Sequence, residues 1–319
     1  MKNKILIIDL SCEIGHVQYN KSFFKHINHK KVHYVLASTE KYLANFKSVK
    51  IKKIALIKDL SSNKKVQIIQ QLTALVLLRT LREYRDFTPL FLTYNTYVIF
   101  LANILGFFRV QPYLINHNNI DFGLKSKLKK AVLSYVLNKN RHIFLSGYIS
   151  KKIQSSFGVS SMVFNHPIYF ERNLRQVIQS KKNNALFIGD YLNKKEILNK
   201  LQNMLVYVKS ADSVTHKNVI ETKPYIENIS AVMDNSKYVV INRVYNLRVS
   251  SLFFKSLGKG CIILMPTCLF SINMKKRFPK HIFLIENLTS LPIYNKQMML
   301  KATISVKKQQ PPLSYDPLP

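Results

Sequence analysis

The stretch KYVVINRVYNLRVSSLFFKSLGKGCIILM, residues 237–265, decides the fold class, because it predicts a strand, a helix and a second strand in close succession. KYVVI is a continuous apolar run, as expected of a strand that is buried on both faces of a parallel sheet. A polar loop leads into an apolar helical segment that is expected to start near Val249. Glycines close that segment before the second strand, so the stretch predicts one unit of a parallel α/β sheet.

The same alternation extends through the rest of the chain. ILIIDL at residues 5–10 is a first buried strand, and further strands and helices alternate after it as far as HIFLIEN at 281–287. The pattern breaks at ERNLRQVIQSKKNN, a basic stretch that reads as an interdomain crossing, and then restarts. We therefore expect two doubly wound α/β domains, over residues 1–170 and 181–300. The Pro-rich segment 301–319 is expected to be a flexible tail.

The chain is strongly basic for a globular composition. It has 319 residues, of which 47% are hydrophobic, and its 49 Lys and Arg outweigh 16 Asp and Glu to give a net charge of +33. Such a charge favours a polyanionic partner, namely nucleic acid, an anionic membrane or a phosphorylated substrate. The alternative is a solvated lysine-rich surface with no partner, because the chain is rich in Lys, Asn and Ile together.

The cysteines and the hydropathy of the chain indicate in which cellular compartment the protein is expected. Cys12, Cys261 and Cys268 are scattered without a CxxC pair, which argues against a disulfide framework or a zinc site and fits a reducing cytoplasm. The apolar run from Thr96 to Phe108 is shorter than the roughly 20 residues that cross a bilayer. We expect a cytoplasmic protein that does not span a membrane and can lie on one.

Two loops of the first domain carry candidate site residues. In open α/β sheets ligands bind beyond the carboxyl ends of the strands. After the first strand, Gly15 would let backbone amides approach a ligand, and His16 and Asn20 could point into the crevice. An ordinary turn before a helix explains this loop equally well.

The second loop, NHNNIDFG at 116–123, gathers polar side chains where a core strand has just ended. Asp121 is explained in part as a favourable residue near a helix start, although it could also act as a base. His117 has no such structural explanation. We predict a catalytic role for His117.

The loop between the strand and helix of the opening stretch predicts an anion site. The free backbone amides at a helix start bind anions, and Ser250 and Ser251 would add hydroxyl groups there. Arg248 lies beside them and Arg243 one loop away. Because the planar guanidinium suits phosphate oxygens, the pair predicts a diphosphate ligand. A capped surface helix with solvated arginines is the alternative.

This arrangement resembles the GT-B glycosyltransferases. KSLGKGCII, residues 255–263, has the shape of a segment that reads like EAMACGVPVI in many of them, and the likeness in architecture and spacing covers most of residues 4–290. The resemblance implies two Rossmann-like domains that face a cleft, with a nucleotide-sugar donor in the second. It also implies that a residue placed like His117 lines the reaction centre. Many retaining members carry two glutamates where this chain has Leu247 and Lys255, which puts a uridine or guanosine sugar in doubt.

A basic span suggests how the protein meets its acceptor. Residues 122–170 contain no acidic residue, and Lys125, Lys127, Lys129 and Lys130 crowd the start of a predicted helix. A one-signed face of this kind is usually solvated, but it also suits an anionic lipid surface. In GT-B enzymes that build cell-surface glycans the resemblance implies a lipid-linked acceptor.

These observations lead to one functional hypothesis and two rivals. The hypothesis is a glycosyltransferase, peripheral on the inner face of the plasma membrane, that transfers a sugar from a nucleotide-sugar to a lipopolysaccharide, capsule or related glycan. Lys194 and Lys195 would assist Arg243 and Arg248 at the diphosphate, and no metal or cofactor is expected, since no DxD-like motif is present. The rivals are a basic nucleic-acid-binding protein and a GT-B protein that binds without turnover.

Overall fold

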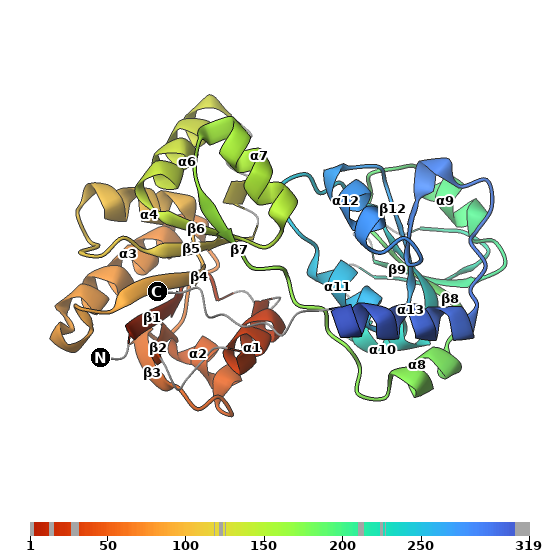
Figure 1. The fold of residues 1–319 in the computed structure, drawn as a ribbon, viewed down its shortest axis with the longest axis horizontal. Helices are drawn as coiled ribbons and strands as arrows, with labels where there is room; N and C mark the ends of the chain where they lie inside the picture. The colour runs from red at the N-terminus through yellow and green to blue at the C-terminus, as the bar shows by residue number, and fades with distance from the viewer. Residues whose placement is uncertain are drawn as a thin grey trace. The chain divides into compact units, whose positions relative to one another are not determined.

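The computed structural model describes residues 3–12, 16–26, 32–117, 119–120, 124, 126–209, 214–223, 226 and 228–309. The chain forms two compact units, one that runs to Asn165 and one that begins at His166 (Figure 1). The first unit ends five residues before the expected residue 170, whereas the second begins 15 residues before the expected residue 181. Each unit has its own parallel sheet, so the predicted α/β class is confirmed.

The first unit is built on a seven-stranded sheet in which all neighbouring strands run parallel. The order β3-β2-β1-β4-β5-β6-β7 reverses between β1 and β4. The strands are β1 Asn3–Asp9, β2 Val32–Thr39, β3 Lys52–Ile57, β4 Thr88–Thr93, β5 Tyr113–Asn116, β6 Arg141–Phe144 and β7 Ser161–Val163. The helices are α1 Val17–His26, α2 Glu40–Leu43, α3 Lys64–Thr80, α4 Thr96–Ile104, α6 Lys127–Lys139 and α7 Gly147–Phe157.

Helices α3, α4 and α6 cover one face of this sheet. Leu6 and Ile8 of β1 pack in one cluster with Leu75 of α3, Ile99 of α4 and Val136 of α6. The alternate β1 residues Ile5 and Ile7 point to the other face and are also fully buried. Both faces are therefore covered, which explains why these strands are continuous apolar runs.

The second unit has a six-stranded parallel sheet of order β10-β9-β8-β11-β12-β13, which reverses between β8 and β11. Its strands are β8 Lys182–Ile188, β9 Leu205–Lys209, β10 Val219–Lys223, β11 Ser236–Ile241, β12 Ile262–Met265 and β13 Ile282–Leu284. Its helices are α8 Leu174–Ser180, α9 Lys194–Lys200, α10 Ile229–Asn235, α11 Ser251–Gly258, α12 Leu269–Arg277 and α13 Lys296–Gln309.

Two parts of the chain are more ordered than the sequence suggested. The basic stretch read as an interdomain crossing contains α8, whose Leu174 and Ile178 are buried. The expectation of a flexible tail from residue 301 is wrong for residues 301–309, which belong to α13. Met299 and Val306 of that helix are buried, because its apolar side packs on the second unit. Residues 310–319 lie outside the described part of the chain.

The glycines of KSLGKG allow close packing at the end of α11. A Cβ added to Gly258 would lie 2.1 Å from the carbonyl oxygen of Tyr169, a contact that no side chain tolerates. Gly260 has a φ of +66°, a conformation that favours glycine. The small residues that suggested a family segment thus have a structural purpose in this chain.

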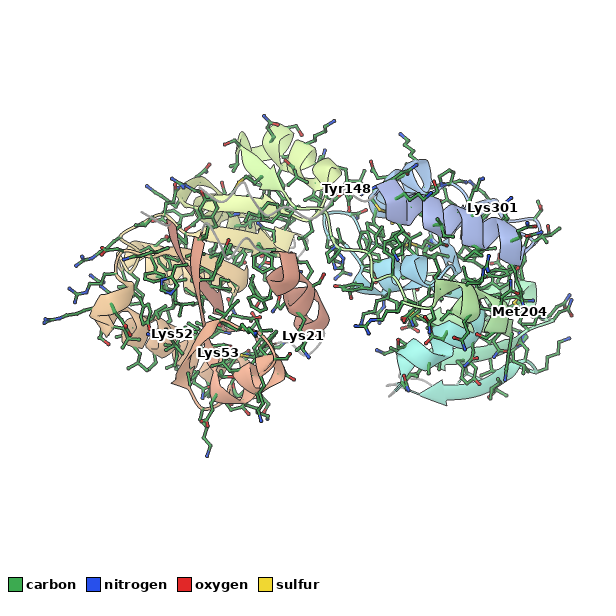
Figure 2. The ribbon with its side chains drawn as sticks, turned by 60° about the horizontal axis from the view of Figure 1, so that its bottom comes forward. Lys21, Lys52, Lys53, Tyr148, Met204 and Lys301 are labelled. Carbon is green, nitrogen blue, oxygen red and sulfur yellow. The ribbon has the colours of Figure 1, made fainter. Side chains whose placement is uncertain are left out.

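Basic side chains are exposed on both units, among them Lys52 of β3 and Lys301 of α13, which Figure 2 labels. Among the described helices, none has the length and apolarity needed to cross a bilayer.

Candidate functional site

Two histidines predicted from separate loops meet at the carboxyl edge of the first sheet. His16 directly precedes α1 in the connection after β1, and His117 directly follows β5. Their rings stack with centroids 4.4 Å apart and an interplanar angle of 24°. The ring of Tyr19 meets the edge of His117 at 4.9 Å. The group lies near the point where the strand order reverses, which is the usual ligand position in such sheets.

The orientation of His117 is fixed by its backbone partner. Its Nε2 lies 3.0 Å from the carbonyl oxygen of Leu92, and because a carbonyl only accepts, this nitrogen carries a proton. The side chain is only 8% exposed. His117 is therefore a positioned and largely buried imidazole, whereas the neighbouring His16 is half-buried.

Asp9, at the end of β1, organises a buried polar cluster that the sequence did not single out. Its carboxylate accepts from Asn20 Nδ2 at 2.7 Å, from Thr93 Oγ1 at 2.5 Å and from the backbone amide of Cys12 at 3.2 Å. Asn20 is fully buried, so it supports Asp9 and does not point into an open crevice as its position suggested. Burial raises the pKa of the Cys12 thiol, which argues against Cys12 as a thiolate nucleophile.

A second buried chain of hydrogen bonds supports the loop that carries His117. Tyr94 Oη donates to Asn116 Oδ1 at 2.5 Å, and Asn116 Nδ2 lies 3.1 Å from His142 Nδ1. His142 Nε2 lies 3.2 Å from the carbonyl of Val136, so Nε2 donates and Nδ1 accepts. Burial lowers the pKa of His142 to about 4. This imidazole is neutral and structural.

In the second unit, Asn242 joins the two loops that flank the reversal between β8 and β11. Its side chain accepts from the Leu192 amide at 2.9 Å and donates to the Leu192 carbonyl at 3.0 Å. Its backbone oxygen accepts from Tyr191 at 3.1 Å. A Cβ on Gly189 would overlap the backbone oxygen of Asn242, and the φ of Gly189 is +103°, so glycine is required at this approach. The two predicted donor loops therefore lie against each other.

The predicted anion residues sit around the start of α11. Arg248 lies over the ring of Tyr245 at 4.8 Å, whereas Arg243 is exposed. The helix begins at Ser251, two residues after the expected start near Val249, and Ser250 is its N-cap, whose Oγ accepts from the Phe253 amide at 3.3 Å. The Ser250 hydroxyl oxygen thus accepts a hydrogen bond from the helix itself. Ser251, which is half-buried, is the first residue of the helix.

The remaining predicted residues of the second unit are less directly placed. Lys194 and Lys195 open α9 beyond β8, but Lys194 pairs with Asp190, which reduces its value as a ligand for an anion. Lys195 is exposed. Where many retaining GT-B enzymes have glutamates, Leu247 is buried, and burial together with the nearby Lys259 lowers the pKa of Lys255. A residue in the place of Lys255 cannot accept hydrogen bonds from a ribose while it remains protonated.

Several predictions fall outside the described residues, namely Gly15, Asp121 and Lys125. Lys127, Lys129 and Lys130 occupy the first turn of α6, which Ser126 caps by accepting from the Lys129 amide. In the described part of the chain, no three His, Cys, Asp or Glu side chains are grouped so that they could hold a metal ion.

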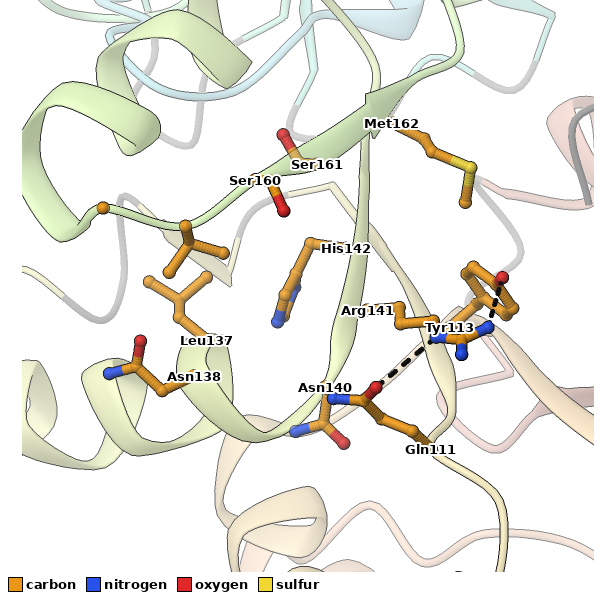
Figure 3. Close-up of a pocket in the computed structure, with 12 residues that line it drawn as sticks. Gln111, Tyr113, Leu137, Asn138, Asn140, Arg141, His142, Ser160, Ser161 and Met162 are labelled. Atoms are coloured by element: carbon orange, nitrogen blue, oxygen red, sulfur yellow. Dashed lines mark hydrogen bonds between the residues drawn. The ribbon is translucent and has the colours of Figure 1, made fainter.

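A cavity of about 630 Å³ lies at the opposite, amino-terminal edge of the first sheet (Figure 3). Arg141 in its wall donates to Tyr113 Oη at 2.7 Å, and Ser160 and Ser161 lie across from it. Because ligands of open α/β sheets bind beyond the carboxyl ends of the strands, we place the candidate site at His16 and His117 and not here.

Comparisons with known proteins support the fold. No protein-family model matches the chain, and no curated protein matches it in sequence. Among solved structures it is similar to a glycosyltransferase from Rickettsia africae, at 9% identity and a TM-score of 0.52, with 95% of this chain and 94% of that chain covered. It is similar to the UDP-GlcNAc 2-epimerase from Neisseria meningitidis bound to UDP-GlcNAc, at 11% identity and a TM-score of 0.51, with coverage of 98% and 93%.

A third similar structure is UGT73P12 from Glycyrrhiza uralensis, complexed with glycyrrhetinic acid 3-O-monoglucuronide, at 11% identity and a TM-score of 0.50, with coverage of 98% and 91%. The chain thus has the GT-B fold that the sequence suggested. Because glycosyltransferases and epimerases both appear among these structures, the fold alone does not name the reaction.

Proposed function

We propose that the protein is a glycosyltransferase that moves a sugar from a nucleotide-sugar to a glycan or lipid-linked acceptor. One observation carries the proposal: in a GT-B fold, Arg243, Arg248 and the start of α11 gather at the carboxyl edge of the second sheet, close to its reversal point. Guanidinium groups and free helix amides are suited to a diphosphate.

The chemical role of this edge is to stabilise the leaving group. Departure of a nucleoside diphosphate from a sugar develops negative charge on the phosphate oxygens. The Arg248 guanidinium lies over the Tyr245 ring, and the first backbone amides of α11 follow Arg248 closely in the chain. In this proposal these donors stabilise the negative charge on the phosphate oxygens without a change of protein conformation. Arg243 and Lys195 are exposed and would approach the phosphates from the neighbouring loops.

In this proposal the acceptor binds at the histidine pair of the first unit. His117 is oriented by Leu92 and is largely buried, so the half-buried His16 is the member that can reach substrate. In this proposal His16 removes a proton from the acceptor hydroxyl and His117 holds its ring in place. The catalytic role that the sequence predicted for His117 is therefore divided in this proposal: His16 accepts the proton and His117 positions the ring of His16.

The acceptor class follows from the charge of the first unit. A lipopolysaccharide, a capsule precursor or another lipid-linked glycan would be presented at an anionic surface, and the first turn of α6 offers Lys127, Lys129 and Lys130 to such a surface. We accordingly place the protein in the cytoplasm, peripheral on the inner face of the plasma membrane.

The test is a thermal-shift screen of nucleotides and nucleotide-sugars against the full chain, followed by product analysis for each binder. We expect a nucleoside diphosphate to raise the melting temperature, and its sugar to appear on an added lipid-linked acceptor. Stabilisation without turnover would favour a binding protein. A 2-epimer of the sugar as product would replace transfer with epimerisation. If duplex DNA bound with a steep salt dependence and no nucleotide bound, the nucleic-acid alternative would hold.

A further inference from the structure

The outward side of α3 carries several exposed apolar side chains, and this helix lies on the surface of the first unit. Its inward residues Ala74, Leu75 and Leu78 join the core of the sheet. The outward side carries four exposed apolar residues next to Lys64, Lys65 and Arg79: Val66 is 43% exposed, Ile69 64%, Val76 44% and Leu77 42%. Exposed apolar side chains that gather on the outward side of a helix are normally covered by another surface.

The neighbouring helix α4 has the same property. Residues 95–108 contain no charged side chain at all. Leu101 is 36% exposed, Ile104 55% and Leu105 57%, while Ile99 on the inner side is fully buried. A fully uncharged helix with an exposed apolar side is unusual on a soluble surface.

Helix α6 extends this surface on the far side of α4. Phe100 of α4 meets Tyr135 of α6 edge to face at 5.1 Å, and the three helices share one face of the sheet (Figure 1). Leu128, in the first turn of α6, is 70% exposed and stands between Lys127 and Lys130. We call the outer side of these helices the α3–α4–α6 face.

The charged side chains on the three helices of this face have a single sign. The three helices carry seven Lys and Arg, three on α3 and four on α6, and no Asp or Glu. A second copy of the chain that docked face to face would set these cations against one another. An anionic partner would neutralise them instead, so charge complementarity selects the occupant.

Three arginines gather at one end of the same face. A small cavity between α3 and the segment after α4 is lined by apolar side chains, among them Leu78 and Phe107, and by Arg79, Arg85 and Arg109. The Arg79 guanidinium lies over the Phe107 ring at 5.9 Å. Apolar side chains next to guanidinium groups match the boundary between the acyl chains and the phosphates of a lipid.

We propose that the α3–α4–α6 face docks on an anionic phospholipid bilayer, with Ile69, Ile104, Leu105 and Leu128 entering the acyl boundary while the surrounding Lys and Arg contact the phosphates. This inference rests on the membrane attachment in the proposed function and specifies the surface that makes it, but it does not depend on sugar transfer. It also differs from attachment by lysines alone. Apolar insertion is not screened by salt, so part of the binding persists at high ionic strength.

The test is co-sedimentation of the full chain with vesicles of phosphatidylcholine alone or mixed with phosphatidylglycerol. The variant exchanges the four inserted residues for Gln: Ile69→Gln, Ile104→Gln, Leu105→Gln and Leu128→Gln. The matched control exchanges Leu205, Ile220 and Ile293 for Gln, which are 54%, 47% and 86% exposed on the second unit. Because all these side chains are exposed, neither variant should lose more than a few degrees in melting temperature.

We expect the parent and the control to bind the mixed vesicles, and to keep a measurable part of that binding in 1 M salt. The four-residue variant should bind at least tenfold less and lose all binding in 1 M salt. Parental binding by that variant, or equal binding of the parent to both kinds of vesicle, would overturn the proposal. So would a parent that is dimeric without lipid and a variant that is monomeric. Vesicle binding without any nucleotide binding would refute only the sugar-transfer function.

Discussion

The imidazole rings of His16 and His117 stack at 4.4 Å although they follow β1 and β5, two strands that are separated in the sheet by β4. The pair therefore bridges the end of β4, next to the reversal point of the strand order. Leu92 of β4 accepts from His117, so the strand beneath the pair also fixes it. An arrangement that draws on three strands is well suited to hold a reacting group in one orientation.

Replacement of His16 with Ala should lower turnover by about 100-fold or more, the range expected for a general base. The side chain is half-buried and precedes α1, so the melting temperature should change little. The measurement is single-turnover sugar transfer together with a melting curve. His33→Ala is the control, because His33 is exposed on β2. Unchanged transfer by the His16 variant would remove this residue from the mechanism.

The anion site makes a separate prediction in the second unit. Arg248→Lys keeps the charge but loses the planar fork that suits two phosphate oxygens, so we expect donor affinity to fall about tenfold or more. Arg248→Ala should lose more. Arg175→Ala is the matched control, since Arg175 is an exposed arginine of α8. Titration calorimetry with the nucleoside diphosphate found by the screen measures the effect, and parental affinity in both Arg248 variants would contradict the diphosphate site.

The sequence predicted the fold where strands are buried on both faces. Continuous apolar runs such as ILIIDL are direct signs of such strands, and the histidines after β1 and β5 were correctly assigned to the same edge of the sheet. Strand β10, with the sequence VIETK, was not predicted. It lies at the edge of its sheet, next to β9. Edge strands are often short and charged, so their pattern resembles a loop.

The buried polar groups could not be predicted in the same way. Asp9 was visible only as a charge at the end of an apolar run, and its partners Asn20 and Thr93 come from distant parts of the chain. Helix α8 could have been found, because Leu174, Val177 and Ile178 follow helical spacing within the basic stretch. The polar and basic residues around them concealed that pattern.

Exchange of Gly258 for Ala should destabilise the second unit. The new Cβ would meet the carbonyl oxygen of Tyr169 at 2.1 Å, and both atoms belong to packed backbone that cannot move independently. Overpacking of this kind costs about 1–3 kcal/mol, which lowers the melting temperature of a unit this size by several degrees. Gly147→Ala is the control, because a Cβ there meets nothing within 4 Å. Equal melting temperatures for both variants would show that the backbone at residue 169 yields easily.

Two buried histidines predict how stability changes with pH. Burial lowers the pKa of His142, in the first unit, and of His281, in the second, to about 4, compared with about 6.5 in an unfolded chain. Between these values the unfolded state binds more protons than the folded state, so protonation favours unfolding. Above about pH 6.5 these histidines do not change the free energy of unfolding. As the pH falls from 6.5 toward 4, each of them lowers the free energy of unfolding.

The expected slope is about 1.4 kcal/mol per pH unit for each histidine within that window. His142→Gln abolishes the titration while an amide can still donate to the carbonyl of Val136, which His142 Nε2 reaches at 3.2 Å. In denaturant unfolding at pH 7.5, 6 and 5, the free energy of unfolding of the first unit should then fall less steeply with decreasing pH. The pH dependence of the second unit should be unchanged. A parental slope in the His142 variant would mean that other groups govern acid unfolding.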